Sequence, residues 1–434
     1  MWFKGEGQLS RRGFLKSACL LVVTPFLSSC AEATARGSFL NLLPEQKEIE
    51  IGRAYIPYAV EEWDGLYPEE EVQAYIRTVG LALVKQVDRK LPYQFYVVNS
   101  SKVNAFALPG GPVMLTRGLF LRLGSESELA SVLAHELGHI NARHHARFLE
   151  KQFGINLLLS IGSLLLGDKP YGQALLQFSQ IGAGLMTLKF SRDQEREADR
   201  YGILYTYKAG YDPAGMIRVF EIFRSMEREG RPPEWLSTHP LPETRIREVS
   251  REIEKLKPSG AFIADTQDFQ RVKSKLKETQ ASFEEFDKGK RAFGERNYRT
   301  ALEHFRRAAE IYPENYPARA YMAYLLAKEG RVVEAERQSL WALQIRQEVF
   351  LTNYVHGYVK FAQGEYQTSL KYLQKANQLI PDHPSTHYYL GRNYEALGHR
   401  SKAVEHYRLA LELSEGKAPW AEDARERLRK LGGI

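Results

Sequence analysis

The residues of this chain with the clearest chemical potential are two histidines with a glutamate between them. His135 and His139 are four positions apart, and Glu136 follows the first of them. In a helix, residues four apart stand one turn above each other on the same face, so the two imidazoles can bind one ion. Nitrogen ligands at this spacing suit Zn²⁺, which in catalytic sites takes three protein ligands and keeps a fourth position for water.

Glu136 is the residue that we expect to act as a general base. It lies next to a ligand and can reach a water on the ion, whose pKa zinc lowers to about 7, as that water attacks a carbonyl carbon. The motif is short, and we expect it by chance in roughly one chain in a hundred of this length. A third ligand is therefore needed to support a zinc site.

The third ligand is predicted in a second helical segment, residues 192–202. Glu195 and Asp199 lie four apart on one face of it. Glu195 is the predicted ligand, and Asp199 is predicted to accept the outer N–H of a ligating histidine and so fix its tautomer. Taken alone, the acidic pair would favour a solvated helix face. His144 and His145, close to the motif, are expected to be solvent-exposed helix residues.

Further elements must position these side chains. Residues 44–87 repeat apolar positions at steps of three and four, which predicts helix. Residues 93–98 are rich in β-branched and aromatic side chains, and residues 104–108 and 113–116 flank the turn sequence at 109–112. A small β-sheet is therefore predicted directly before the metal-binding helix.

The start of the metal-binding helix carries its own signal. Ser125 and Glu128 match the capping box, in which a serine precedes the helix and a glutamate follows three residues later. This pattern predicts a helix that opens after Ser125 and carries His135.

Residues 154–189 contain two apolar, glycine-spotted stretches, 155–166 and 174–188. Each is too short to cross a bilayer comfortably, because a spanning helix needs about 20 apolar residues. Three interpretations stay open for this segment: a buried helical hairpin, a mobile lid, and a segment that dips into lipid.

The C-terminal part is periodic. Small residues recur every 34 positions, the period of tetratricopeptide repeats, in which they let paired helices pack closely. Two such series are Ala301, Ala335, Ser369 and Ala403, and Ala308, Ala342, Ala376 and Ala410. We predict a linker helix at 258–281, four repeats at 282–415 and a capping helix at 416–434. Solenoids of this kind commonly present a concave surface to a protein partner.

The predicted fold class is α+β. A mainly helical, zincin-type metalloprotease domain with a small β-sheet occupies residues 30–257 and precedes an all-α solenoid. The formal charge of +7 gives little support to nucleic-acid binding, because the basic residues are interspersed with acidic ones.

The N-terminal residues 1–29 resemble an export signal. Arg11 and Arg12 precede an apolar run, as in twin-arginine signals, and the run ends at Cys30 in a sequence like a lipoprotein cleavage site. Cys30 would then carry a lipid anchor, and the alternative is an incidental or buried cysteine. The other cysteine, Cys19, also lies in this region, so we expect no disulfide in the folded body.

Together these motifs resemble the HtpX and CAAX-prenyl-protease superfamily of zinc metallopeptidases. The motifs are the segments His135–His139, Glu195–Asp199 and Asn104–Gly111. With the repeats, the closest form is the BepA-like subgroup, which joins such a domain to C-terminal tetratricopeptide repeats in the periplasm. The resemblance implies one zinc per chain, cleavage of unfolded or misassembled outer-membrane proteins, chaperone-like help in their assembly, and a lipid-anchored place at the periplasmic side of the outer membrane. The several membrane spans of the integral-membrane members are missing, which argues against prenyl-protein processing.

The same resemblance points to His239 in the sequence Ser237–Pro240. It matches a segment whose histidine reaches the zinc and displaces the catalytic water. A fourth protein ligand would silence the site, and release of His239 would switch it on. The alternative is a capping histidine before a proline turn.

The predicted hairpin also suggests how a substrate is held. Asn104, Ala105, Phe106 and Ala107 would form an edge strand whose free backbone groups pair with an extended chain. Such pairing does not depend on a particular side-chain sequence, so unfolded proteins are the expected substrates.

Two other functional classes compete with an endopeptidase. In the first, the chain is a lipoprotein scaffold or assembly chaperone, its repeats do the biological work, and zinc is structural or regulatory. In the second it is an aminopeptidase, which is less favoured because no residues in the sequence obviously trap a free amino terminus.

Overall fold

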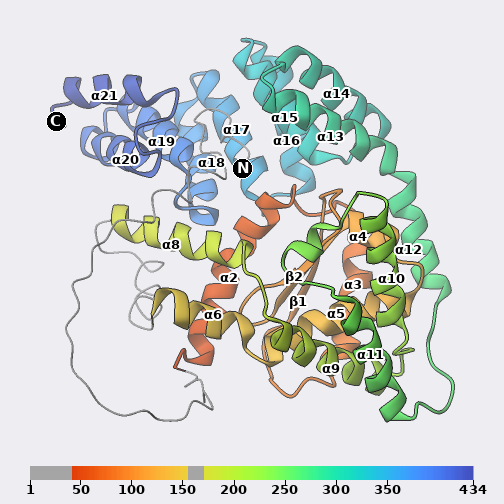
Figure 1. Ribbon diagram of the computed structural model, residues 1–434. Coiled ribbons are helices and arrows are strands. Elements are labelled where there is room, and N and C mark those ends of the chain that lie inside the picture. The colour runs from red at the N-terminus through yellow and green to blue at the C-terminus, as the bar shows by residue number, and fades with distance from the viewer. Residues whose placement is uncertain (1–41, 155–170, 434) are drawn as a thin grey trace, which may run out of the picture.

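The computed structural model describes residues 42–154 and 171–433, and it places a helical domain with a small sheet next to an array of helix pairs (Figure 1). The helices before the array are α2 Glu45–Glu62, α3 Glu70–Val84, α4 Arg117–Arg122, α5 Glu126–Asn141, α6 His144–Phe153, α8 Tyr171–Met186, α9 Arg192–Lys208, α10 Gly215–Arg228, η2 Glu234–Ser237, α11 Glu243–Leu256 and α12 Gln267–Glu278. The predicted α+β class is confirmed.

The sheet of the described chain has three strands in the order β1-β3-β2. β1 (Gln94–Val98) runs parallel to β3 (Pro112–Thr116), and β2 (Ala105–Ala107) runs antiparallel to it. Gly110 and Gly111 take positive φ values of 74° and 132° in the connection from β2 to β3, so glycine suits this turn. The strands predicted on both sides of the turn are therefore present.

The array consists, in the part that the structure covers, of four antiparallel helix pairs and a closing helix. Its helices are α13 Gln280–Gly294, α14 Tyr298–Ile311, α15 Tyr316–Lys328, α16 Val332–Ile345, α17 Phe350–Ala362, α18 Tyr366–Leu379, α19 Pro384–Ala396, α20 Arg400–Leu413 and α21 Ala421–Lys430. The small residues of the 34-residue period are buried where the paired helices meet, as predicted.

The segment predicted as a linker helix packs against the first domain. It forms α12 and the start of α13, and Phe269 of α12 stacks on Phe120 of α4 at a centroid distance of 5.7 Å. The connection between the domain and the repeats is therefore part of a packed core.

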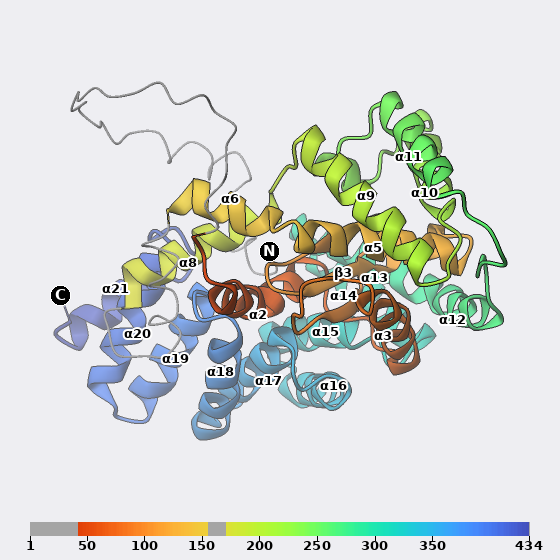
Figure 2. The same ribbon diagram turned by 90° about the horizontal axis from the view of Figure 1, so that it is seen from below.

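Two hydrophobic cores divide the described residues in an unexpected way. The sheet packs with α3, α5, α10 and α12 in one of them. The other contains the repeats together with α2 and α8, although both of these helices precede the metal-site helix α9 in sequence. Figure 2 shows α2 and α8 lying beside α17 to α20. The repeats and the first domain thus share α2 as a common core element.

The inner face of the array was predicted to bind a partner, but it contacts the rest of the same chain. The first helices of the second and third repeats, α15 and α17, are buried on nearly all sides. Tyr58 of α2 donates a hydrogen bond to Asp382, and Arg346 donates to the carbonyl of Tyr67 at 3.0 Å. α2 packs against α17, whereas α8 packs against α20, the second helix of the fourth repeat. A partner at the inner face would have to compete with α2.

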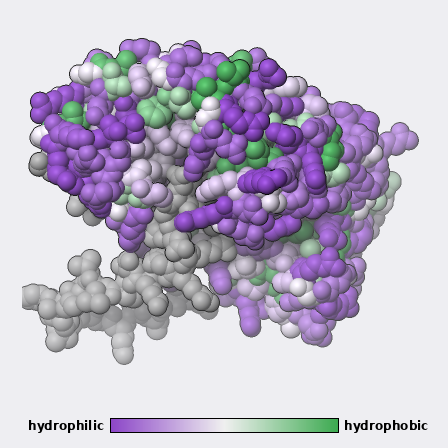
Figure 3. All heavy atoms as spheres, turned by 90° about the horizontal axis from the view of Figure 1, so that it is seen from above, coloured by the Kyte–Doolittle hydropathy of each residue, from purple (hydrophilic) through white to green (hydrophobic). Residues whose placement is uncertain are grey.

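The outer surface of the array is mostly hydrophilic. Seen from above, it carries apolar side chains only in separate groups (Figure 3). Among the exposed apolar side chains, Val333, Leu340 and Trp341 all belong to α16. α16 therefore exposes apolar side chains to solvent, whereas the apolar side chains of α15 are buried.

The second apolar stretch of segment 154–189 is a packed helix. α8 buries Leu175, Phe178, Ile181 and Leu185, and the ring of Phe178 stacks on Tyr55 of α2 at 4.4 Å. This half agrees with the buried interpretation. The first stretch, 155–166, and the N-terminal signal with Cys30 lie outside the described residues. Among the residues described, no helix is both long and apolar enough to cross a membrane.

The contact between α2 and the β2–β3 turn gives a stability prediction. A Cβ atom on Gly52 would lie 1.7 Å from the carbonyl oxygen of Pro109. Gly52→Ala should therefore lower the free energy of unfolding by about 2 kcal/mol or more, since backbone must shift to admit the methyl group. Gly294→Ala is the control, because a Cβ there meets no atom within 4 Å. Denaturant titration of both variants checks this, and equal stabilities would contradict the close contact.

Candidate metal centre

The site is built where α5 and α9 pack closely against each other. A Cβ on Gly138 of α5 would lie 2.7 Å from the carbonyl oxygen of Ala198, and a Cβ on Gly202 of α9 would lie 3.1 Å from the backbone nitrogen of His135. Glycine at both positions lets the two backbones approach. The predicted ligands on the two helices are therefore brought face to face.

The two helices begin in different ways. Ser125 precedes α5 as predicted, but the capping box does not form, because the Ser125 hydroxyl bonds to the Glu128 carboxylate instead of a backbone N–H. Glu128 accepts from the backbone of Gly124 at 2.6 Å. The complete capping box belongs to α9, where Ser191 and Gln194 satisfy each other's backbone N–H groups. The sequence Ser-x-x-Gln at 191–194 is the local signal for this capping box.

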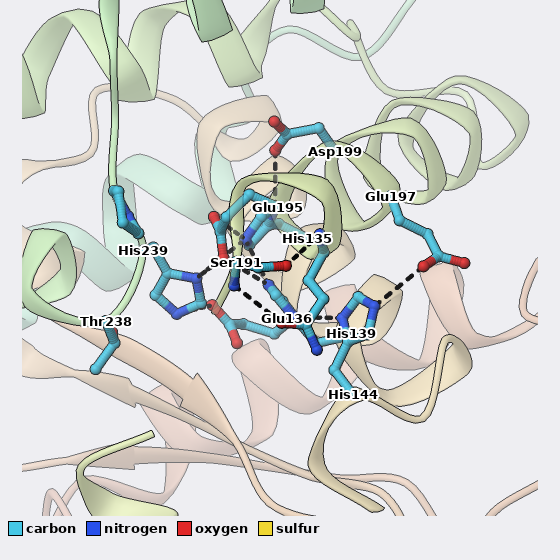
Figure 4. A network of polar contacts seen from close by, with 12 residues as sticks. His135, Glu136, His139, His144, Ser191, Glu195, Glu197, Asp199, Thr238 and His239 are labelled. Atoms are coloured by element: carbon cyan, nitrogen blue, oxygen red, sulfur yellow. Dashed lines mark hydrogen bonds and ion pairs between the residues drawn. The ribbon is translucent and has the colours of Figure 1, made fainter. Parts of the chain in front are cut away.

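Four buried side chains converge at the centre of the site. They are His135, His139, Glu195 and His239, and one ligand atom from each lies within 4.8 Å of all the others. The Nε2 atoms of His135 and His139 are 3.1 Å apart, and Glu195 carboxylate oxygens lie 3.7 Å and 3.4 Å from them. Figure 4 shows these side chains pointing toward one another from α5, α9 and the segment after η2. The structure thus brings together all four residues that the sequence nominated.

Most of the donor atoms have separations close to those that a small cation requires. A tetrahedral ion with bonds of about 2.0–2.1 Å holds its ligand atoms about 3.3–3.4 Å apart. His239 Nδ1 lies 2.9 Å from Glu195 Oε1 and 3.4 Å from His135 Nε2. These separations lie close to the expected edge length. The residues present therefore fit a metal ion.

The protonation states also suit metal binding. Burial lowers the pKa of His139 well below its ordinary value, so the ring is neutral and has a free lone pair. Burial raises the pKa of Glu195, but the nearby His239 and Arg245 outweigh this effect and hold it well below the ordinary value. A neutral imidazole and an ionised carboxylate are the forms in which these groups bind metals.

Asp199 and Arg245 contact the candidate ligands on the side that faces away from the centre. Asp199 Oδ1 lies 3.0 Å from His135 Nδ1, the nitrogen that faces away from the centre. Arg245 of α11 bonds both oxygens of Asp199 at 2.6 Å and 2.7 Å and lies 2.5 Å from Glu195. Burial raises the pKa of Asp199, and the arginine charge outweighs it, so the net pKa is lowered. Sequence reasoning missed Arg245, since an arginine in a charge-rich helix has no distinguishing pattern.

Glu136 sits at the edge of the donor cluster. Burial raises its pKa to about 7, although His135 and a hydrogen bond from Trp235 act in the opposite direction. The Trp235 indole N–H donates to Glu136 Oε1 at 3.4 Å. The same indole stacks on His239 with an interplanar angle of 11°. Trp235 was also missed, because a lone tryptophan before a loop carries no motif.

His144 and His145 are buried, and their expected exposure to solvent was wrong. The exposed fractions are 0% and 4%. Arg143, with a φ of 56°, turns the chain between α5 and α6, so that α6 begins next to the end of α5. His144 Nδ1 then lies 2.9 Å from Nδ1 of His139. A local turn that no motif indicated brought these residues into the site.

The predicted substrate strand lies at the edge of the sheet and next to α5. Asn104, Ala105 and Ala107 are buried, and Phe106 is half-buried with Trp63 5.4 Å from its ring. Just before this strand, the carbonyl of Val103 accepts a hydrogen bond from the backbone of Trp235 at 3.2 Å. The segment that carries His239 therefore contacts the start of the edge strand.

Comparison with known proteins agrees with this site. Residues 70–253 match Peptidase family M48, and residues 292–338 and 348–416 match the tetratricopeptide repeat. The chain is similar to proteins named beta-barrel assembly-enhancing protease. It is 37% identical over 209 residues to that of Yersinia pestis, which covers 46% of this chain and 43% of the relative. It is 33% identical over 252 residues to that of Escherichia coli K12, which covers 56% of this chain and 50% of the relative.

A third relative is a mitochondrial protein. The mitochondrial metalloendopeptidase OMA1 of Arabidopsis thaliana is 35% identical over 157 residues, which cover 36% of this chain and 31% of the relative. The chain thus spans half or less of the length of each of these three curated relatives.

The geometry predicts one metal ion per chain. Glu195→Ala should lose most of the bound metal, because it removes the only carboxylate among the four converging donors. Asp193→Ala is a matched control in the first turn of the same helix, since its side chain is 94% exposed. Elemental analysis after gel filtration measures both. Equal metal content in the two variants would show that Glu195 is not a ligand.

Proposed function

We propose that this chain, which joins an M48 peptidase domain to tetratricopeptide repeats, is a zinc-dependent endopeptidase of the bacterial cell envelope. It cleaves unfolded or misassembled outer-membrane proteins. The observation that carries the proposal is the convergence of His135, His139 and Glu195 on one point with Glu136 beside them. The names of the relatives, an assembly-enhancing protease and a metalloendopeptidase, support the same class of activity.

Zinc is the metal that we propose. Imidazole nitrogens with one carboxylate in a tetrahedral arrangement suit this ion, and catalytic zinc sites commonly use three such ligands. When bound, zinc supplies Lewis-acid chemistry, lowering the pKa of a water and polarising a substrate carbonyl.

The protein groups have separate tasks in this reaction. Glu136 takes a proton from the attacking water and passes it to the leaving amine, which suits a carboxyl group whose pKa lies near 7. Asp199 holds the outer nitrogen of His135 and so fixes the orientation of that ring. Arg245 keeps Asp199 and Glu195 ionised and in place.

The substrate is held in an extended form along β2. A three-residue strand at the sheet edge beside α5 would align a scissile peptide bond with the metal through backbone hydrogen bonds. A folded domain cannot offer such an extended segment. This is the reason to propose unfolded proteins as substrates.

In the proposed enzyme, His239 is the inhibitory residue. Its Nδ1 occupies the fourth position of the donor cluster, where a water would otherwise bind. The segment before it bonds to Val103 at the start of the edge strand. Movement of this one segment would therefore free both the metal position and part of the substrate path, which is a route to regulation.

The N-terminal motifs and the names of the relatives support a cellular setting for the proposed enzyme. The export signal and the acylation of Cys30 would place the enzyme on the periplasmic side of the outer membrane. The repeats would bind a protein partner, such as the outer-membrane assembly machinery. Because α2 packs against α17 on the inner face, we propose that this partner binds the outer surface, where Val333, Leu340 and Trp341 of α16 are exposed.

An alternative function is a lipid-anchored scaffold or assembly chaperone in which zinc is only structural or regulatory. The repeats favour this reading, since they make up a large part of the fold. Loss of the general base without loss of the metal separates it from the proposed protease.

Glu136→Gln should reduce cleavage of an unfolded protein such as casein by roughly 10²- to 10⁴-fold, the usual contribution of a general base. Bound zinc and thermal unfolding should stay as in the wild type. The control is wild-type protein stripped by a chelator and reloaded with zinc, which should regain its activity. Wild-type cleavage by the variant would refute the proposed mechanism. An inactive variant that fully restores envelope assembly in cells would favour the scaffold.

His239→Ala should raise the initial rate of casein cleavage several-fold, because it opens the fourth metal position while three ligands remain. Glu243→Ala, whose side chain is 79% exposed in the neighbouring helix α11, should leave the rate unchanged. Initial rates at saturating zinc measure both variants. An unchanged or lower rate with His239→Ala, at normal zinc content, would contradict the inhibitory role.

A further inference from the structure

We infer that His144 and Glu197 form a hydrogen-bonded relay that positions the metal ligand His139. This inference rests on the proposed zinc site and concerns the side of the ring that faces away from the metal. His144 and Glu197 are positioning residues, since neither belongs to the converging donor set.

The three side chains lie in a row from the centre of the site toward its rim (Figure 4). His139 directs Nε2 toward the donor cluster and Nδ1 toward Nδ1 of His144, at 2.9 Å. His144 Nε2 lies 3.1 Å from Glu197 Oε2. His139 and His144 are fully buried, whereas the Glu197 side chain is 40% exposed. The row therefore links the buried ligand to a carboxylate at the surface.

The hydrogen-bonding chemistry assigns one tautomer to each ring. A neutral His139 that binds a metal through Nε2 carries its proton on Nδ1, and this N–H must donate. His144 Nδ1 is then the acceptor, so the His144 proton resides on Nε2. That N–H donates to the Glu197 carboxylate, which only accepts. The carboxylate at the surface thus fixes both tautomers and makes His144 a better acceptor for His139.

The two histidine ligands are therefore supported by different means. His135 Nδ1 faces a carboxylate directly, Asp199, which the buried Arg245 holds in place. His139 faces an imidazole, and the carboxylate stands one residue further out. Asp199 and Glu197 both come from α9, which also carries the ligand Glu195. One helix thus supplies a metal ligand and the outer support for both histidines.

The turn before α6 sets the position of His144. Arg143 lies 3.2 Å from the buried carboxylate of Glu48 and donates a hydrogen bond to the carbonyl of Leu43 at 2.5 Å. These contacts fix the left-handed backbone conformation of Arg143, which places His144 next to His139. The next residue, His145, instead packs edge-on against Phe190 at 5.4 Å. His145 is therefore a matched control: buried and adjacent, with its ring centroid 6.3 Å from that of His139.

The test measures zinc affinity by competition with a chelator, using the full chain. His144→Leu fills a similar space without an acceptor, and it should weaken zinc binding about 10- to 100-fold, the usual cost of losing an outer-shell partner. His144→Asn should restore most of the affinity, because its Oδ1 can take the place of Nδ1. His145→Leu should bind zinc as the wild type does. Equal affinity of His144→Leu and wild type would overturn the relay.

Variants of Glu197, whose side chain is partly exposed, test the relay with little effect on folding. Glu197→Gln retains an acceptor but loses the charge, and Glu197→Leu loses both, so zinc affinity should fall in that order while metal-free thermal unfolding changes little. The absorption spectrum of the Co²⁺-loaded protein should shift in the same order, since the basicity of His139 changes. Unchanged affinity and spectrum in Glu197→Leu would refute the role of Glu197. Failure of the wild type to bind zinc would instead refute the proposed function.

Discussion

The close contact between α5 and α9 is the constraint on which the rest of the site depends. Two glycines, Gly138 and Gly202, remove the side chains that would keep these helices apart. The short distance lets the candidate ligands of both helices meet at one point, although the helices are separated by some 50 residues of sequence. Any larger residue at the crossing would widen the gap between the imidazoles and the Glu195 carboxylate.

That crossing also organises the charges around the metal position. α9 directs Glu195 inward, while Asp199 and Glu197 lie behind the two histidines. Burying two carboxylates side by side is costly unless a cation accompanies them. Arg245 supplies that cation from α11, and it lies over the faces of Phe220 and Trp235. The site therefore combines rigid backbone packing with a balanced set of buried charges.

Much of this arrangement could be read from the sequence because it follows local periodicity. The four-residue spacing in both helices nominated three ligands, and the 34-residue period predicted the repeats. What was missed depends on contacts between distant segments. Arg245 and Trp235 reach the site only after the chain folds back along α5, and the burial of His144 depends on a single left-handed residue, Arg143. The contact of α2 with the inner face of the repeats was missed for the same reason. Amphipathic periodicity predicts that a helix has an apolar face, but it does not predict which surface that face will contact.

The membership of α2 in the core of the repeats limits how parts of this chain can be exchanged. A catalytic half and a solenoid that meet through a flexible tether can be recombined freely between genes. Here Tyr55 and Tyr58 of α2 are packed among residues of α8 and the third and fourth repeats. A foreign solenoid grafted after α12 would remove the apolar surroundings that the repeats give this helix. An exchange of the solenoid would therefore require matching changes in α2.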